Sequence, residues 1–329
     1  MPAMSKASRR SFLKALAGTT VAVSTATFAG SALAASAAPP TAVPGIVPGR
    51  TRLVPPSKIG IQMFTIRDKV NSLGFRAVFE ELSRIGYSEV EFAGYTQGSV
   101  GAITLPQLRT LLDDFGLRAV GNHADRTQLL TNTNAVLDGA ETLGMPYIGT
   151  GSSPAAQFTK ASYDTFIPQW NTAGALARSR GMKIYQHNHQ NEFSFASDAP
   201  EIRLYDYFLA NTDPEAVFLE MDVYWAYVGQ YRFPGFEPVQ YILDNPTRFP
   251  LLHLKDGKSN AANANGYDII EFGRGSIPYR EFLSALPDRG ARVGLMEQDN
   301  ASASNNPGYP AGSLGSAEVS FENMIGLRG

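Results

Sequence analysis

The sequence contains no cysteine. This absence excludes disulfide bonds, thiolate metal sites, iron–sulfur clusters and cysteine nucleophiles. A metal ion could be bound only through histidine, aspartate and glutamate side chains. Histidine is also scarce, with four residues in a chain of 329, so the position of each histidine carries information about function.

The sequence also lacks an excess of basic residues. The formal net charge is -2, and Lys6, Arg9, Arg10 and Lys14 fall in a segment without acidic residues, so the rest of the chain is more acidic than the whole. Such a chain binds nucleic acid poorly through non-specific electrostatics, and we expect no nucleic-acid partner. Hydrophobic residues make up 43% of the sequence, which is typical of a globular protein rather than a disordered one.

Residues 1–37 are typical of a twin-arginine (Tat) export signal. Arg9 and Arg10 stand in the segment SRRSFLK, an apolar stretch runs to about Gly30, and residues 32–37 offer alanine-rich cleavage sites. Repeated prolines then predict an extended linker over residues 38–56. No other stretch approaches the roughly 20 apolar residues that span a bilayer. We therefore expect the Tat translocase to export the chain to the periplasm or the medium, with no membrane contact after signal cleavage.

From residue 58 onward, short runs rich in Val, Ile, Tyr and Phe alternate with segments that have apolar residues at helical spacing. The short runs are almost continuously apolar, as expected for parallel strands with both faces covered. The eight expected strands span residues 58–64, 88–92, 117–121, 146–150, 182–187, 217–223, 249–254 and 292–296. The expected helices between them span residues 73–85, 105–115, 132–143, 163–180, 201–210 and 279–286.

Eight βα units over roughly 270 residues predict a single (β/α)8 TIM barrel, a parallel eight-stranded barrel with outer helices. We assign residues 57–329 to this domain. The main competing fold is a doubly wound open sheet. No Gly-x-Gly-x-x-Gly motif follows the first strand, which disfavours the dinucleotide-binding version of that competitor.

The chemistry of a TIM barrel lies at the carboxyl ends of its strands, and here those ends are rich in polar residues. All four histidines fall at the carboxyl ends of expected strands, and carboxylates join them at the ends of strands five to eight. Carboxylates that converge on one face repel one another unless a cation neutralises them. We therefore expect a divalent metal ion, and nitrogen and oxygen ligands leave Mn²⁺, Mg²⁺, Co²⁺, Zn²⁺ and Fe²⁺ as candidates.

Seven segments together resemble the sugar phosphate isomerase/epimerase family of xylose-isomerase-like TIM barrels. They are KIGIQMFTIRD, GYSEVEFAGY, YQHNHQNEF, FLEMDVYWAYVG, RFPLLHLKDG, EFGRGSIPYREFL and GLMEQDN. The resemblance implies one divalent metal ion, two glutamates that also carry protons at a sugar carbon, and a possible homo-oligomer. The implied metal ligands are Glu192, Asp222, His253 and Glu297.

Two positions depart from the family pattern. Many relatives carry the strand-five glutamate where this chain has His187, so either His187 replaces it as a ligand or Glu192 reaches the metal. The ketohexose epimerase branch carries a histidine three residues after the strand-six aspartate, where this chain has Trp225. The segments His-Asn-His and Asp-Val-Tyr-Trp of this chain resemble a branch of the family in which some members act on inososes or 3-keto-glycosides.

Further residues at the strand ends are candidates for catalysis or substrate binding. We favour His187 as a metal ligand or substrate contact, and we interpret His189 as a structural histidine. Lys255 shares a strand face with His253 and could hold an enolate oxygen, act as a base if its pKa is lowered, or form a plain salt bridge.

Four candidates could contact the substrate directly. Tyr224 and Trp225 could stack on a sugar ring or pack in the core. Arg67 and His123 could contact substrate hydroxyl groups.

The expected function is a metal-dependent sugar or keto-sugar isomerase or epimerase. Proton transfer would pass through a metal-stabilised enediolate, with Glu192 or Glu297 removing the proton and the other returning it. A lyase or dehydratase acting on a 3-keto-glycoside or inosose could use the same site. A non-catalytic, exported sugar-binding barrel is a third possibility. In each case the partner is a small carbohydrate, and the sequence shows no arginine cluster or glycine loop for a phosphate group.

Overall fold

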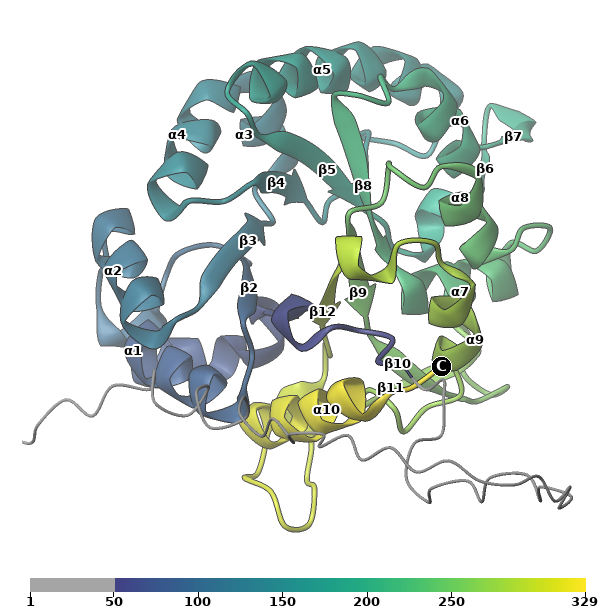
Figure 1. Ribbon diagram of the computed structural model, residues 1–329. Helices are drawn as coiled ribbons and strands as arrows, with labels where there is room; N and C mark the ends of the chain where they lie inside the picture. Colours follow the sequence, from purple (N-terminus) through teal and green to yellow (C-terminus); the bar gives the residue numbers. More distant parts are fainter. Residues whose placement is uncertain (1–50) are drawn as a thin grey trace, which may run out of the picture. The chain divides into compact units, whose positions relative to one another are not determined.

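The computed structural model describes residues 51–329 (Figure 1). The predicted Tat signal and residues 38–50 of the predicted linker lie outside the described residues. The described helices and strands belong to one compact unit. Within residues 51–329, no helix is both long enough and apolar enough to cross a membrane.

Eight parallel strands form one sheet that curls into a barrel (Figure 1). The neighbours in the sheet follow the order β3-β2-β1-β12-β9-β8-β5-β4. A parallel bridge between His123 and Gly149 joins the two outer strands, where the Ala124 N–H donates to the Gly149 carbonyl at 2.8 Å. The strands are β1 Ile59–Gln62, β2 Glu89–Phe92, β3 Arg118–Asn122, β4 Tyr147–Thr150, β5 Lys183–His187, β8 Val217–Asp222, β9 Leu251–Leu254 and β12 Val293–Met296. The predicted (β/α)8 fold and all eight strands are confirmed.

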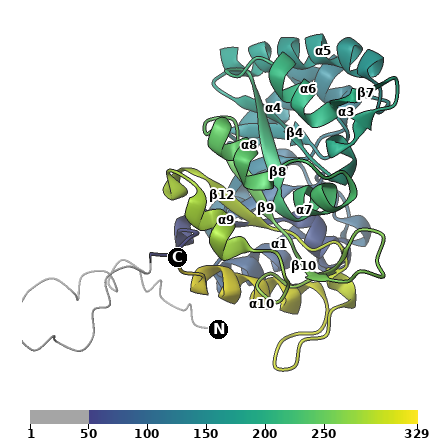
Figure 2. The ribbon, with the colours of Figure 1, turned by 90° about the vertical axis from the view of Figure 1, so that its right-hand side faces the viewer.

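Helices surround the barrel (Figures 1 and 2). α2 shows how the sequence sets their ends: Thr104 and Gln107 form a capping box at its start, and Gly116 ends it with a left-handed φ of 67°. The α-helices are α1 Arg67–Ile85, α2 Leu105–Phe115, α3 Arg126–Thr131, α4 Thr133–Leu143, α5 Lys160–Ser179, α6 Leu204–Asn211, α7 Val223–Arg232, α8 Pro238–Asp244, α9 Tyr279–Ala285 and α10 Ser313–Gly326. The six predicted helices correspond to α1, α2, α4, α5, α6 and α9.

Loops at the carboxyl ends of the strands carry short additional elements. A two-stranded hairpin, β6 Phe195–Ala196 and β7 Ala199–Arg203, follows β5. A second hairpin, β10 Asp256–Ser259 and β11 Tyr267–Ile270, follows β9. The 3-10 helices are η2 Pro56–Lys58, η3 Met63–Ile66, η4 Gly98–Val100, η5 Gln190–Phe193, η6 Arg289–Ala291 and η7 Ala301–Ala303.

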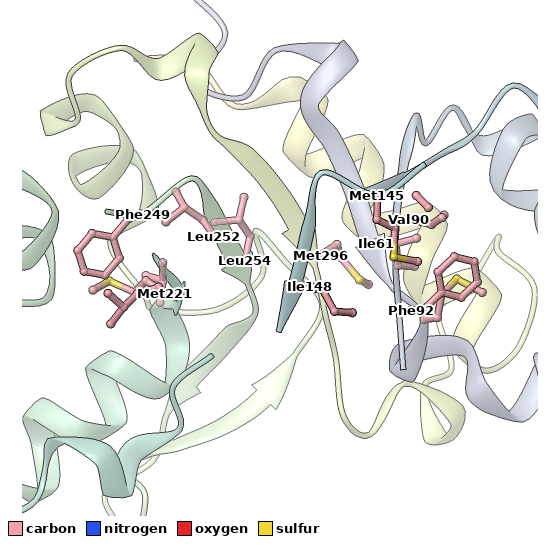
Figure 3. Packing of buried hydrophobic residues seen from close by; sticks show 14 of the residues in the cluster. Ile61, Val90, Phe92, Met145, Ile148, Met221, Phe249, Leu252, Leu254 and Met296 are labelled. Carbon is pink, nitrogen blue, oxygen red and sulfur yellow. The ribbon is translucent and has the colours of Figure 1, made fainter. Parts of the chain in front are cut away.

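The strands alternate between two cores because successive side chains point to opposite faces. One set packs between strands and helices, as Ile61, Val90 and Met296 do in Figure 3. The other set packs inside the barrel as a separate cluster: Val120, Tyr185, Phe218, Leu251, Val293 and Leu295. Continuing this inward set along β8, β9 and β12 leads to Glu220 and Asp222, His253, and Glu297. The apolar cluster therefore forms a floor beneath the polar carboxyl end of the barrel.

Candidate metal centre

Four side chains from β5, β8, β9 and the end of β12 converge at the carboxyl end of the barrel. His187, Asp222, His253 and Glu297 each offer a nitrogen or oxygen atom, and these atoms lie within 4.8 Å of one another. His253 Nδ1 is 2.9 Å from Glu297 Oε2, and His187 Nε2 is 3.4 Å from Asp222 Oδ2. The structure thus brings together three of the four predicted ligands and the predicted alternative His187.

The donor atoms of this group are buried but incompletely paired. Asp222 and His253 are fully buried, and His187 and Glu297 are 2% and 7% exposed. Both ring nitrogens of His187 and the Oδ2 atom of Asp222 lack a hydrogen-bond partner. A buried polar atom without a partner costs about 1–3 kcal/mol. One ring nitrogen of a neutral His187 carries a proton, and a small divalent cation would accept an electron pair from the other nitrogen and from Asp222 Oδ2. The residues present therefore fit a metal ion with nitrogen and oxygen ligands.

The ionisation of the group also suits a cation. Burial and the neighbouring histidines lower the pKa of His187 well below its usual value, so its ring is neutral. Burial raises the pKa of Glu297, but Lys255 and His253 outweigh it and hold that pKa well below the usual value. Burial opposes protonation of His253, yet Glu220, Glu91 and Glu297 raise its pKa well above the usual value. In the metal-free chain, the His253 imidazolium therefore supplies positive charge among the carboxylates.

Lys255 adds a second buried cation beside this group. Its Nζ atom lies 3.1 Å from Glu297 Oε2, 3.3 Å from Asp222 Oδ2 and 3.0 Å from Asp299 Oδ1. Burial disfavours the charged amine, but the three carboxylates raise the pKa of Lys255 above its ordinary value. The salt bridge considered from the sequence is present, and the raised pKa argues against Lys255 as a base.

Glu192 lies apart from the four converging side chains. The strand ends at His187 and the chain turns into η5, where Glu192 Oε2 accepts a hydrogen bond of 2.9 Å from the His189 backbone N–H. The side chain is 2% exposed, and burial raises its pKa to about 7. The expectation that Glu192 joins Asp222, His253 and Glu297 is therefore not met in this structure, because its carboxylate caps the turn.

The two predicted aromatic contacts differ in position. Tyr224 is 1% exposed and its hydroxyl lies 3.5 Å from the Tyr267 carbonyl, so it packs in the core and does not face a sugar. Trp225 is partly exposed, and Lys255 Nζ lies 5.3 Å from the centre of its ring. The indole Nε1–H of Trp225 has no hydrogen-bond partner. Trp225 therefore remains a candidate for substrate contact.

His189 and Arg67 also border the site. The ring of His189 lies 5.0 Å from that of His187 and 5.7 Å from Trp225. His189 therefore lies beside two candidate site residues, and its interpretation as a structural histidine stays a prediction. Arg67 stacks over the Phe64 ring and donates to the Asp299 carbonyl at 2.9 Å, which fixes it at the rim.

A second layer of polar residues lies beneath the candidate metal centre. It consists of Glu91, His123, Glu220 and His253, whose donor atoms also lie within 4.8 Å of one another. His123, predicted to contact substrate, has Nε2 3.0 Å from Glu220 Oε2. Glu91 and Glu220 are not among the site residues predicted from the sequence, although two carboxylates two residues apart within each of the strand segments EVEF and VFLEMD are a usable signal.

Comparisons with known proteins agree with this architecture. Residues 79–312 match the family described as xylose isomerase-like TIM barrel. A sugar phosphate isomerase/epimerase from Parabacteroides distasonis is 22% identical with a TM-score of 0.62, and the match covers 81% of this chain and 93% of that one. No curated protein matches the chain.

Two other solved structures are similar at lower identity. A probable 3-DHS dehydratase involved in petrobactin synthesis from Bacillus anthracis is 14% identical with a TM-score of 0.57, over 80% of this chain and 97% of that one. A xylose isomerase-like protein from Mycobacterium smegmatis, solved in complex with magnesium, is 15% identical with a TM-score of 0.54, over 82% and 96%.

Likeness at these identities shows the fold, and activity has to be argued from the site. The family match extends from α1 to the segment before α10 and includes the four converging side chains. The chain belongs to the xylose isomerase-like TIM barrel family.

Proposed function

We propose that the protein is a divalent-metal-dependent enzyme that moves a proton beside the carbonyl of a sugar or keto-sugar, as an isomerase or epimerase. The observation that carries this proposal is the set of unpartnered donor atoms on His187 and Asp222, next to ionised Glu297 and charged Lys255. The neighbour from Parabacteroides distasonis, described as a sugar phosphate isomerase/epimerase, supports it through shared fold.

His187, Asp222, His253 and Glu297 would hold the metal ion. When bound, the ion would polarise carbonyl and hydroxyl oxygens and lower the cost of negative charge beside them. Glu297 is the carboxylate that would take the proton from carbon, because it is ionised and lies at the mouth of the group. The Lys255 ammonium would stabilise the negative oxygen that develops when that proton leaves.

A β-elimination is the second candidate, favoured by the position of Glu192. Epimerisation or isomerisation by two glutamates needs a second carboxylate at the reacting carbon, and Glu192 is turned into η5. Elimination needs one base: Glu297 takes the C–H proton, those electrons form a C=C bond, and the β C–O bond breaks. The leaving oxygen keeps the electron pair of that bond and takes up the proton from Glu297. A lyase or dehydratase acting on a 3-keto-glycoside or inosose would fit this chemistry. One structural neighbour is described as a probable dehydratase.

We further propose that the substrate is unphosphorylated and that the protein is exported by the Tat system. Arg9 and Arg10 in the signal-like segment support export. Arg67 at the rim is already engaged by the Phe64 and Asp299 carbonyls. An exported enzyme meets free sugars, keto-sugars and glycosides rather than phosphorylated intermediates.

The test combines metal analysis with proton exchange. The purified protein is assayed for bound metal, reconstituted with Mn²⁺, and incubated in D₂O with a panel of keto-sugars and 3-keto-glycosides followed by NMR. Deuterium at one carbon of an intact sugar supports isomerase or epimerase action, and loss of the β substituent supports elimination. Glu297→Gln should lower exchange at least a hundredfold. Glu271→Gln should not, because Glu271 is buried outside the site and bound to Asn306.

The same experiment also tests the third possibility, a non-catalytic sugar-binding barrel. A protein that holds no metal after reconstitution and exchanges no proton, yet binds a sugar of the panel, would be a non-catalytic sugar-binding barrel. Full exchange by Glu297→Gln would remove Glu297 from the proton transfer while leaving metal dependence intact.

A further inference from the structure

The ring of His253 is shared by two layers of side chains. Its Nδ1 atom faces the upper layer, 2.9 Å from Glu297 and 3.9 Å from Asp222. Its Nε2 atom faces the lower layer, 2.7 Å from Glu91 and 3.2 Å from Glu220. Donor atoms in both layers are close enough for a cation, so the role of the lower layer has to be decided by how its atoms are paired.

The lower layer is largely satisfied by its own hydrogen bonds. One oxygen of Glu91 accepts from Gln62 Nε2 at 2.6 Å and from His253, and the other accepts from the Tyr185 hydroxyl. Glu220 Oε2 pairs with His123 at 3.0 Å, and only its Oε1 atom lacks a partner. In the upper layer, in contrast, both ring nitrogens of His187 lack a hydrogen-bond partner, and Asp222 Oδ2 has no hydrogen bond beyond its ion pair with Lys255 at 3.3 Å. The lower layer therefore has the character of a support for the upper one rather than of a second ion site.

We propose that Glu91 is a positioning residue for the metal centre, acting through His253. An imidazole coordinates through one nitrogen only when the other carries its proton, and the acceptor at that other nitrogen selects the tautomer. The Glu91 carboxylate accepts from the His253 Nε2–H and so directs the Nδ1 electron pair toward Asp222 and Glu297. This inference rests on the proposed function, because it presumes a metal ion in the upper layer.

The fold surrounds the Glu91 carboxylate with hydrogen-bond partners from several strands. Its partners come from β1 and β5, and Glu91 is fully buried, so water cannot replace them. Tyr185 reaches Glu91 across the barrel because β3 and β4 carry glycines beside its ring. A Cβ atom on Gly121 would lie 2.9 Å from the Tyr185 hydroxyl oxygen, and one on Gly149 would overlap the ring itself. Residues on five strands thus converge on one hydrogen bond to His253.

The test measures Co²⁺ binding to the full-length protein by calorimetry. We expect one Co²⁺ per chain in the parent protein, and 10- to 100-fold weaker binding in Glu91→Gln with the same stoichiometry. Glu89→Gln is the matched control, since Glu89 precedes Glu91 by two residues on β2 and pairs with Arg118 at 2.6 Å. Its Co²⁺ affinity should not change.

A spectroscopic signature separates positioning from general destabilisation. In the Co²⁺-loaded protein, the paramagnetically shifted N–H proton of His253 should exchange slowly with solvent. Glu91→Gln should shift this signal and speed its exchange, and Glu89→Gln should leave it in place. If Glu91→Gln does not fold, Tyr185→Phe serves instead, because it removes one hydrogen bond to Glu91 and keeps the carboxylate. We expect a smaller loss of affinity in the same direction.

Three results would overturn the inference in distinguishable ways. Two Co²⁺ ions per chain, falling to one in Glu91→Gln, would make the lower layer a second metal site. Unchanged affinity and an unchanged N–H signal in Glu91→Gln would remove the positioning role and leave the proposed function standing. A parent protein that binds no Co²⁺ or Mn²⁺ would remove the proposed function and this inference together.

Discussion

At the scale of single residues, Glu192 shows how a buried carboxyl group can serve to cap a turn. It is 2% exposed, and it accepts a hydrogen bond from the backbone N–H of His189 and contacts the Ser153 side chain. Burial raises its pKa to about 7. The folded chain therefore holds a proton on Glu192 at pH values where the unfolded chain releases it.

This difference predicts a pH effect on stability. Between the unfolded pKa near 4.5 and the folded value of about 7, the unfolded state binds fewer protons, so the free energy of unfolding falls as pH rises. Glu192→Gln removes this contribution, which is on the order of 1–3 kcal/mol. We expect the variant to lose less stability than the parent between pH 5 and pH 8 in urea denaturation. The exposed Glu80→Gln should behave like the parent, and equal losses in all three proteins would contradict the assignment.

The same residue marks the limit of prediction from sequence at this scale. The sequence predicts three of the converging side chains, because each falls at the end of an apolar run that is typical of a strand: Asp222, His253 and Glu297. Whether Glu192 reaches the site depends on how the chain turns after β5, and in the structure Glu192 forms a capping box with His189, three residues earlier. Glu91 and Glu220 were assigned no role because they lie within strands, where the sequence gives no sign of which other carboxylates and histidines they meet.

At the scale of elements, the strands were predictable and several helices were not. Parallel strands buried on both faces leave a strong apolar signal. α7 is missing from the prediction because Val223–Arg232 has aromatic residues on most sides and no clear polar face. Its start is set by Asp222, whose Oδ1 accepts from the Trp225 N–H at 2.9 Å while Oδ2 faces the site. One carboxylate thus begins a helix and contributes to the candidate metal centre.

The closure of the barrel depends on a glycine at the end of β4. Gly149 pairs with His123 across the closing bridge, and a Cβ atom there would overlap both the ring and the carbonyl oxygen of Tyr185. We expect Gly149→Ala to lower the free energy of unfolding by about 1–3 kcal/mol, as overpacking does. Thermal and urea denaturation measure this loss. Gly326→Ala at the end of α10 meets no atom within 4 Å and should be neutral or slightly stabilising. A neutral Gly149→Ala would mean that Tyr185 can move without cost.

At the scale of the whole molecule, the barrel separates its apolar, packed interior from the polar side chains at its carboxyl end. The apolar cluster fills the interior below, the hydrogen-bonded layer of Glu91 and Glu220 lies above it, and the unpaired donors lie at the mouth. Charge that is costly to bury is thereby concentrated at one end, where a cation can offset it. A bound ion should consequently stabilise the entire fold and not only the loops around it.

The stabilisation by metal follows from mass action and tests which residue serves as the strand-five ligand. An ion at a hundred times its dissociation constant adds about 2.7 kcal/mol, or several degrees in Tm for a chain of this size. Mn²⁺ should raise the Tm and EDTA should lower it. His187→Ala and Asp222→Asn should abolish the shift, since they remove the unpaired donors, whereas Glu192→Gln should retain it because its carboxylate lies in the turn. The reverse pattern, with the shift lost in Glu192→Gln and kept in His187→Ala, would restore Glu192 as the ligand and require β5 to extend beyond His187 in the metal-bound protein.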